Sequence, residues 1–493
     1  MPSAQKKMVR TFLDEIPNGT EETQKLELQK SRNERKNLTD GATDKILYRD
    51  IIRIAWPSLV ELLLTSLVSM VDMMMVGSIA NGTAAISSVS LATQPRFIFM
   101  TLLMSLNTGT TAVIARARGR GEHDRANTIL KHALIFSIVL TVVSSVLGII
   151  LAEPLIRFMS GTGNMAESTV MDGVAYLRIQ MAGFITLTLS MCITASLRGT
   201  GNSRVPMIYN ITANLVNVCF NYLLINGHFG FPALGVRGAS IATVIGQTVA
   251  CCIAIYSITS GKFYFKIRIR EKFKFDFQII AAIAKIGIPA LIEQGIMRVG
   301  MILFSRQVAA LGEIDFTTHN VCMNIQSLSF NNGQAFAVSA TTLVGQSLGK
   351  WRSDFAEHYS RRCRRLGLCV SLFLMAVFAI FGKYIVGFYD KTPEVMAKGA
   401  TIMIFVACLQ PIQCSQFILA GALRGAGDTK ATAVISLCTV LILRPVLGYV
   451  CISLLHMGVI GAWVAVCCDQ VLRSVLVLAR YNSGKWKNVK VNI

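Results

Sequence analysis

One carboxylate and a pair of amides stand out in the first half of the chain because they lie inside long apolar runs. Asp72 occurs in the run MVDMMMVG, and Asn217 and Asn221 occur in YNITANLVNVCFNYLL. An ionisable side chain within a membrane-spanning segment is costly, and it is by default a candidate for function. A carboxylate grouped with amide and hydroxyl oxygens suits a hard cation or a proton. Asp72 is therefore a candidate ion-binding group.

The spacing of these residues indicates how they would meet. Asn217 and Asn221 are four residues apart, so they share one face of a helix. Both lie in the outer half of their segment, at a depth similar to that of Asp72, and Thr243 in the next segment could add another oxygen. The alternative is that the asparagines only hydrogen-bond one helix to another, as polar residues often do in membranes. For Thr243 the two interpretations are evenly matched.

A second pair of charges lies in the second half of the chain. Glu293 lies roughly 20 Å along its segment at 1.5 Å per residue, and Arg444 lies at a similar depth in a later segment. Opposite charges at equal depth in a membrane should pair, so we predict an ion pair between Glu293 and Arg444. Two roles for Glu293 remain open. It contacts a substrate cation or carries a proton, or it is a purely structural partner of Arg444.

The elements that must position these groups are membrane helices. Hydrophobic residues make up 53% of the chain and charged residues 15%. Uncharged runs such as HALIFSIVLTVVSSVLGIILA at 132–152 exceed the roughly 18 residues of a bilayer-spanning helix. An all-α membrane protein of twelve transmembrane helices is predicted, and the helices begin near Asp50, Ala84, Ala126, Thr169, Arg204, Val236, Phe277, Phe316, Phe355, Pro393, Thr429 and Gly458.

The net charge of +21 is distributed in a way that predicts topology. Lys and Arg gather in alternate loops, for example at 116–125, 262–274 and 350–365, whereas the intervening loops near 79, 225 and 311 are nearly free of them. This is the positive-inside pattern. It predicts a multi-pass protein of the inner (plasma) membrane, in contact with the lipid bilayer and with both termini in the cytoplasm. No nucleic-acid partner is needed to explain the charge.

Several short sequences occur twice, at similar offsets. LRGTGNS at 197–203 returns 226 residues later as LRGAGDT at 423–429. Other pairs are separated by 232, 230 and 223 residues, and they are Pro57 with Pro289, Gly119 with Gly349, and Gly235 with Gly458. Repeated motifs at similar offsets indicate two homologous halves. With six helices in each half, the halves enter the membrane in the same direction and form a parallel repeat.

The duplication divides the chain into five predicted parts. They are a charged cytoplasmic tail (1–47), a first lobe with six helices (48–261), a basic cytoplasmic linker (262–276), a second lobe with six helices (277–484) and a basic tail (485–493). Two six-helix bundles that face each other enclose a central cleft. The LRGxG phrase is predicted to form a tight cytoplasmic turn with glycine as a left-handed cap, and it is not counted among the binding residues.

The ordered set of motifs resembles that of the multidrug and toxic compound extrusion (MATE) family. The motifs are the P-x3-E openings at 57 and 289, MVDMMMVG at 70–77, ATTLVGQSLGKWRSDFA at 340–356, and the paired LRGxG and G-V-x-G-A segments. The resemblance spans about 48–482. It implies an antiporter of six plus six helices that expels amphipathic, often cationic compounds while Na⁺ or H⁺ enters. It also implies that Asp72, Asn217 and Asn221 form a cation site in the first lobe.

We therefore expect a monomeric secondary exporter that works by alternating access. Its substrates would be amphipathic, cationic drugs or metabolites, its transported ion Na⁺ or H⁺, and it would be no enzyme and need no cofactor or structural metal. The sequence contains no GxxxxGK[ST] motif, which argues against direct use of ATP. Two alternatives remain. One is a flippase for lipids or lipid-linked saccharides, with an extended basic cleft, and the other is a membrane-embedded sensor or binding protein that does not transport.

Overall fold

The computed structural model describes residues 43–79, 82–160, 166–266, 275–389 and 392–489. Residues 51–493 form one compact unit, separate from residues 1–50. All candidate site residues belong to the unit 51–493. Parts of three predicted regions lie outside the described residues, namely 1–42 of the N-terminal tail, 267–274 of the linker and 490–493 of the C-terminal tail.

The described residues fold into helices joined by short connections, with no strand among them. The helices of the first half are α3 (Thr43–Gly77), α4 (Gly82–Arg120), α5 (His123–Ile150), α6 (Ala152–Ser160), α7 (Glu167–Ala182), α8 (Phe184–Gly199), α9 (Arg204–Asn226) and α10 (Gly235–Thr259). Those of the second half are α11 (Phe277–Ala309), α12 (Glu313–Gly349), α13 (Ser353–Tyr389), α14 (Pro393–Ala426), α15 (Thr429–Ser436), α16 (Arg444–Tyr449) and α17 (Gly458–Asn482). Two 3-10 turns, η1 (His228–Gly230) and η4 (Lys485–Asn488), and two π-helical turns, η2 (Leu437–Leu443) and η3 (Val450–Leu454), complete the set.

Within the described ranges, the helices form twelve passages of membrane length. Ten are long and apolar enough to cross a membrane, and one of these, Thr429–Leu454, consists of α15, η2, α16 and η3 in succession. α7 and α8 together form an eleventh span, bent by 50° at their junction. α12 is the twelfth, since its 37 residues are long enough although many of them are polar. The predicted all-α membrane fold is confirmed.

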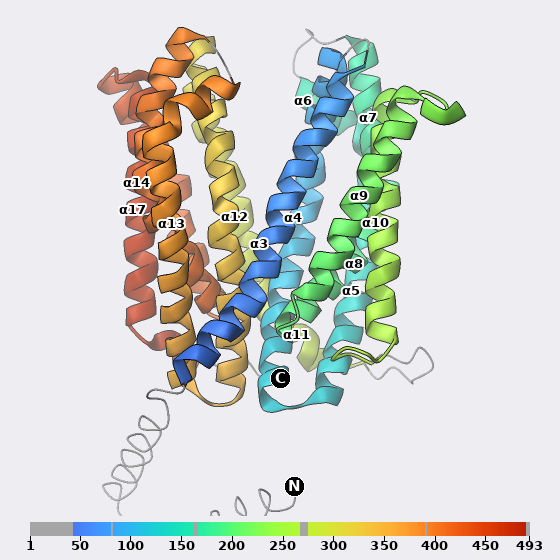
Figure 1. Cartoon of the computed structure of the whole chain (residues 1–493), viewed down its shortest axis with the longest axis vertical. Coiled ribbons are helices and arrows are strands. Elements are labelled where there is room, and N and C mark those ends of the chain that lie inside the picture. Colours follow the sequence, from blue (N-terminus) through green and yellow to red (C-terminus); the bar gives the residue numbers. More distant parts are fainter. Residues whose placement is uncertain (1–42, 80–81, 161–165, 267–274, 390–391, 490–493) are drawn as a thin grey trace, which may run out of the picture. The chain divides into compact units, whose positions relative to one another are not determined.

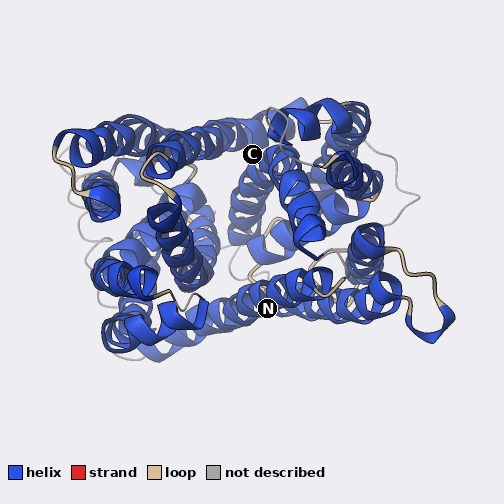
Figure 2. Ribbon diagram, turned by 90° about the horizontal axis from the view of Figure 1, so that it is seen from above, coloured by secondary structure: helices blue, strands red, loops and turns tan. Residues whose placement is uncertain are grey.

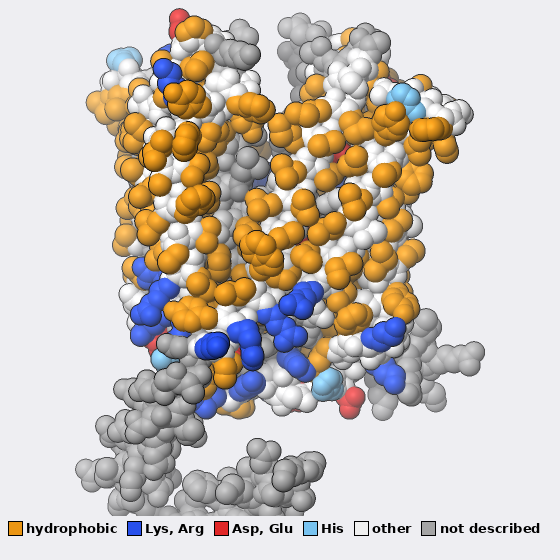
Figure 3. Space-filling model, in the orientation of Figure 1, with side chains coloured by type: hydrophobic (Ala, Val, Ile, Leu, Met, Phe, Trp, Pro, Cys, Tyr) orange, Lys and Arg blue, Asp and Glu red, His pale blue; other side chains and the backbone are white. Residues whose placement is uncertain are grey.

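The helices are arranged in two lobes that stand side by side (Figures 1 and 2). The first lobe contains α3 to α10, and the second contains α11 to α17. Lys and Arg side chains gather at one end of the molecule (Figure 3), here called the basic end, where α4 finishes with Arg118 and Arg120. The lobes lie together at this end. Toward the opposite end they diverge, and the surface between them is hollowed (Figures 1 and 3).

The first helix of each lobe contributes a segment to the core of the other lobe. In α3, Ile51 is buried in a cluster with Leu423 of the second lobe, whereas Val76 near the far end of α3 belongs to a first-lobe core. In α11, Ile283 is buried in a cluster with Ile114 of the first lobe. α3 and α11 therefore cross from one lobe to the other. Each contains an internal proline just beyond the exchanged segment, where a missing backbone hydrogen bond favours a bend.

Close backbone contacts join the lobes at the basic end. Gly119 of α4 and Gly349 of α12 lie so near the backbone of the other helix that a Cβ atom on either would overlap with it. The side chains of Thr342 and Gln346 on α12 donate hydrogen bonds of 2.9 Å to the last backbone carbonyls of α8, beginning with that of Arg198. The space between the lobes is thus closed at the basic end and opens toward the opposite end.

Candidate functional site

The structure brings together the residues predicted to form an ion site. Asn221 Nδ2 donates to Asp72 Oδ1 at 2.7 Å. When the Asn217 amide is oriented to satisfy both of its ends, its Nδ2 donates to Asp72 Oδ1 and Oδ2 at 2.9 and 3.1 Å. The Oδ1 atom of Asn217 then accepts from Thr243 Oγ1 at 3.2 Å. Asn217 and Asn221 are buried. Three helices, α3, α9 and α10, therefore meet at one carboxylate.

The amides around Asp72 can either donate N–H groups to its carboxylate or turn their oxygens toward a bound cation. In the arrangement described, the carboxylate accepts N–H groups from two amides, and Asn221 Oδ1 is buried without a hydrogen-bond partner. Rotation of an amide about its Cβ–Cγ bond exchanges its nitrogen and oxygen. The site would then present a carboxylate, two amide oxygens and a hydroxyl, which are ligands suited to a hard cation. Among the described residues, no cluster of three or more His, Cys, Asp or Glu side chains occurs.

Polar contacts continue from Asp72 along the seam between α3 and α9. Asn214 Nδ2 donates to Thr65 Oγ1 at 3.2 Å, and Asn210 Nδ2 donates to Glu61 Oε1 at 2.7 Å. These two contacts and the one between Asn221 and Asp72 each join residues 149 positions apart, because the two helices run in the same direction. We call this series the α3–α9 ladder. It connects the Asp72 site to Glu61, about three helical turns nearer the basic end.

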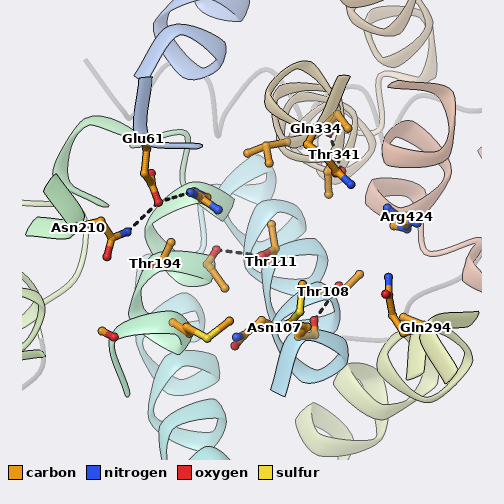
Figure 4. A pocket seen from close by; sticks show the side chains of 18 of the residues that line it. Glu61, Asn107, Thr108, Thr111, Thr194, Asn210, Gln294, Gln334, Thr341 and Arg424 are labelled. Atoms are coloured by element: carbon orange, nitrogen blue, oxygen red, sulfur yellow. Dashed lines mark hydrogen bonds and ion pairs between the residues drawn. The ribbon is translucent and has the colours of Figure 1, made fainter. Parts of the chain in front are cut away.

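Glu61 lies at the wall of a cavity of about 370 Å³ between the lobes. This volume is within the usual range of small-molecule sites. Figure 4 shows Glu61 and Asn210 on one side of the cavity and Gln294 and Arg424 on the opposite side, with Thr111 of α4 between them. The cavity therefore has one wall from each lobe, and it lies above the contacts that close the basic end.

Two equivalent ion pairs face this cavity, one in each lobe. Arg198 Nη2 lies 2.8 Å from Glu61 Oε1, and Arg424 Nη2 lies 2.7 Å from Glu293 Oε1. Each acid is the glutamate of a P-x3-E opening, and each arginine belongs to an LRGxG phrase. The charges of these four side chains sum to zero. The duplication seen in the sequence is thus repeated in the charges of the cavity.

The LRGxG phrase has a second role that sequence reasoning missed. The predicted turn is confirmed, since Gly201 and Gly427 adopt left-handed φ angles of +85° and +84°. Arg198 and Arg424 of this phrase also line the cavity, a position that the sequence analysis did not expect. Helical side chains tilt toward the N-terminus of their own helix. That rule directs an arginine in the last turn back into the lobe, and it could have identified both residues.

The predicted ion pair between Glu293 and Arg444 is wrong. Glu293 pairs with Arg424, while Arg444 donates through Nε and Nη2 to Asp469 Oδ2, with Nε at 3.1 Å. Arg473 Nη2 donates to the same oxygen at 2.9 Å. Asp469 is fully buried, and the sequence analysis did not single it out as a candidate. Thr432, near the start of the span that contains Arg444, donates to Glu293 Oε2, so Arg444 lies about 18 Å farther along that span and the two residues are not at equal depth.

Comparison with known proteins agrees with the division of the structure into two lobes. The MatE family model matches twice, over residues 57–223 and 289–450, once in each half. The chain belongs to the MatE family. Its similar proteins include the probable multidrug resistance protein NorM of Thermotoga maritima, which is 26% identical over 446 residues covering 89% of this chain and 93% of the relative. The multidrug resistance protein MdtK of Yersinia pestis is 24% identical over 439 residues, or 88% of this chain and 94% of that protein.

Solved structures of MatE relatives share the fold at low sequence identity. One is described as the outward-facing conformation of a multidrug resistance MATE family transporter, and it aligns with a TM-score of 0.81 at 19% identity, covering 88% of this chain and 96% of that chain. A transporter from Pyrococcus furiosus aligns with the same TM-score and identity over 90% of this chain and 97% of that chain. The family match in both halves confirms the resemblance of the sequence to the MATE family, and these structures share its fold.

The two halves of this MatE chain differ at the depth of the Asp72 site. Phe304 lies 232 residues after Asp72, which is the offset of the two prolines. The guanidinium of Arg444 lies over the Phe304 ring, 5.8 Å from its centroid, and binds Asp469. At the equivalent depth the second lobe therefore contains the positively charged side chain of Arg444, whereas the first lobe contains the Asp72 carboxylate with amide partners. This asymmetry favours the first lobe as the place for an exchangeable ion.

Proposed function

We propose that this protein is a secondary active exporter that moves amphipathic small molecules out of the cell in exchange for Na⁺ or H⁺. The relatives named as multidrug resistance proteins align over nearly their whole length. A cavity between two lobes that are closed at one end and apart at the other suits alternating access. With the basic end in the cytoplasm, as the positive-inside rule expects, the described conformation would face outward.

The observation that best supports the proposed ion exchange is the arrangement of side chains around Asp72. An exporter needs a group that binds the driving ion with different affinity in its two conformations, because a ligand shifts an equilibrium only by differential affinity. Asp72 is a carboxylate within a span, and it holds α3 to α9 through Asn221 and Asn217. A proton or a cation on Asp72 would cancel its charge and replace N–H donors by oxygens. Ion binding would therefore alter how α3 packs against α9.

The α3–α9 ladder supplies a route from the ion to the substrate. A shift of α3 against α9 at Asp72 also moves the contacts of Thr65 and Glu61 with α9, because all three residues lie on one helix. Glu61 faces the cavity. Occupancy of the ion site would thus change the position of a charged group that a substrate meets. Such a link between two sites is reciprocal, so substrate binding would also weaken or strengthen ion binding.

The Asp72→Asn variant tests this function. The amide keeps the size of the side chain but cannot change its charge, so ion-driven transport should be lost while substrate still binds in the cavity. The purified protein would be placed in liposomes, and efflux would be followed under a Na⁺ gradient and, separately, under a pH gradient. Asp315→Asn, an acid paired with Lys398 at the far end of the second lobe, is the matched control. Wild-type efflux by Asp72→Asn under both gradients would disprove the proposal.

The cavity charges weigh against the lipid-flippase alternative. A flippase for lipid-linked saccharides would be expected to carry an extended basic cleft, whereas here each arginine of the cavity is paired with a glutamate. Lipid scrambling by the same liposomes would support the flippase instead. Substrate binding without any movement would support a sensor.

A further inference from the structure

We propose that the cavity is polarised across the two lobes and selects amphipathic zwitterions, with the cationic group of the substrate at Glu61 and the anionic group at Arg424. This inference rests on the proposed export function, and it names the substrate class of that site. It follows from the different hydrogen-bond state of the two ion pairs, although these pairs are equivalent in the duplication.

The first-lobe wall contains an acceptor that is not satisfied. Glu61 Oε1 accepts hydrogen bonds from Arg198 at 2.8 Å and from Asn210 at 2.7 Å. Glu61 Oε2 is buried and has no hydrogen-bond partner. A buried acceptor without a partner is costly, and for a charged group the cost is larger still. An ammonium or other N–H donor of a substrate would satisfy this oxygen, so the first lobe offers a place for a cationic group.

The second-lobe wall contains donors and no open carboxylate oxygen. Glu293 Oε1 accepts from Arg424 at 2.7 Å, and Glu293 Oε2 accepts from Thr432 Oγ1 at 2.8 Å. Both oxygens are therefore in use, and the Glu293 side chain is only 5% exposed. Arg424 is 19% exposed and lines the cavity beside Gln294 (Figure 4). A guanidinium has five N–H groups, so Arg424 can hold Glu293 and still donate to an anion of the substrate.

Arg198 also has a buried Nε without a partner, so the first lobe is not free of donors. The asymmetry lies in the acceptors. Of the two carboxylates, Glu61 has one oxygen without a hydrogen-bond partner, whereas both oxygens of Glu293 accept hydrogen bonds. A substrate cation is therefore directed to the first lobe, and a carboxylate at the other end of the same molecule then reaches the second lobe.

The charge balance of the cavity favours a substrate without net charge. The four charged side chains of the cavity sum to zero. A substrate with one positive charge would add an uncompensated charge to a partly buried site, which is costly at low dielectric. A zwitterion adds no net charge. Between the two ends, apolar side chains such as Met104, Met191 and Val338 suit the body of an amphipathic molecule, and methionine adapts to different shapes.

The test uses a rhodamine dye with a free carboxyl group, a zwitterion, and the ethyl ester of the same dye, a monocation. Fluorescence anisotropy on the purified protein measures the affinity for each dye, and dye efflux from liposomes measures transport. The wild type should bind the acid more tightly than the ester. Arg424→Gln should weaken binding of the acid by about tenfold, which is the loss of one charge-assisted hydrogen bond. It should bind the ester equally well or better, because Glu293 loses its counter-charge.

Two variants serve as controls for folding and position. Arg424→Lys keeps the positive charge, so it should retain the preference for the acid. Arg480→Gln removes an arginine that pairs with Asp428 at the basic end and should leave both affinities unchanged. Equal affinity of the wild type for the two dyes, or an unchanged preference in Arg424→Gln, would overturn the polarised cavity. Preferential binding of the acid without gradient-driven efflux would instead overturn the export function and uphold the polarity.

Discussion

The middle contact of the α3–α9 ladder provides a direct test of the proposed coupling between ion and substrate. Thr65 touches neither the Asp72 carboxylate nor the cavity, but its hydroxyl accepts the Asn214 amide at 3.2 Å. Thr65→Val keeps the shape of the side chain and removes the hydroxyl. Thr65 Oγ1 also donates to the backbone oxygen of Glu61 at 2.8 Å, so the matched control is Thr65→Ser, which keeps both hydrogen bonds.

The size of the expected effect follows from this contact. Hydrogen bonds between helices in a membrane average about 0.6 kcal/mol, with a maximum of about 1.7 kcal/mol. Thr65 is exposed, so the lower figure applies. A loss of about 0.6 kcal/mol reduces a coupling factor about threefold, because 1.4 kcal/mol corresponds to a factor of ten. Thr65→Val should therefore weaken coupling about threefold without preventing either ligand from binding alone.

The assay measures the dissociation constant of the substrate with and without saturating Na⁺, and at low and high pH, in detergent-purified protein. The ratio of the two constants is the coupling factor, and linkage requires the same factor for the effect of substrate on the ion. Thr65→Val should lower the ratio and leave substrate affinity without the ion unchanged. An unchanged ratio in both Thr65→Val and Asn214→Ala would refute the ladder as the route of coupling.

Three further predictions concern stability and topology. Asp469→Asn leaves two buried arginines without their shared counter-charge, so it should lower the free energy of unfolding by about 3–5 kcal/mol, measured by thermal unfolding. Its control is Glu153→Gln in an exposed ion pair, which should change the free energy of unfolding by less than about 1 kcal/mol. Trp486→Ala removes a fully buried ring that stacks on a tyrosine and should cost about 3–5 kcal/mol in the same measurement, so an unchanged melting temperature would contradict this packing. Cysteine at Ser78 should react with an impermeant thiol reagent from outside intact cells and cysteine at Lys262 should not, since both positions are exposed and lie at opposite ends of the protein; the reverse pattern would disprove the topology.

The features that could be predicted from the sequence depend on local properties. The length of an apolar run determines whether a helix can span a bilayer, and the repeated motifs reveal the duplication without any knowledge of packing. The Asp72 site was also accessible. Asn217 and Asn221 share a helix face because they are four residues apart, and Asp72 is the one acid that follows Glu61 in its helix, eleven residues later. Few partners were therefore possible, and the structure places these residues in contact.

The partner of Glu293 was decided by the tertiary structure alone. Three arginines of the second lobe each form an ion pair with one of two buried acids, and they are Arg424, Arg444 and Arg473. Residue number gives depth only where helices begin at the same level, and α11 begins nine residues before Ile286, whose backbone oxygen accepts from Thr429 at the start of α15. The direction in which a side chain points depends on the rotation of that helix about its axis, which the packing of all neighbouring helices sets together.

The cavity itself also depends on long-range packing. The exchange of the first segments of α3 and α11 between the lobes brings each P-x3-E glutamate to the place where an LRGxG arginine turns inward. The sequence shows both motifs twice, but their partners lie 137 and 131 residues away along the chain. A residue pattern on one helix contains no information about which other helix will cover it. The sequence by itself thus determined the helices, the repeat and the grouping of Asp72 with two asparagines, whereas packing between the lobes determined the charged cavity.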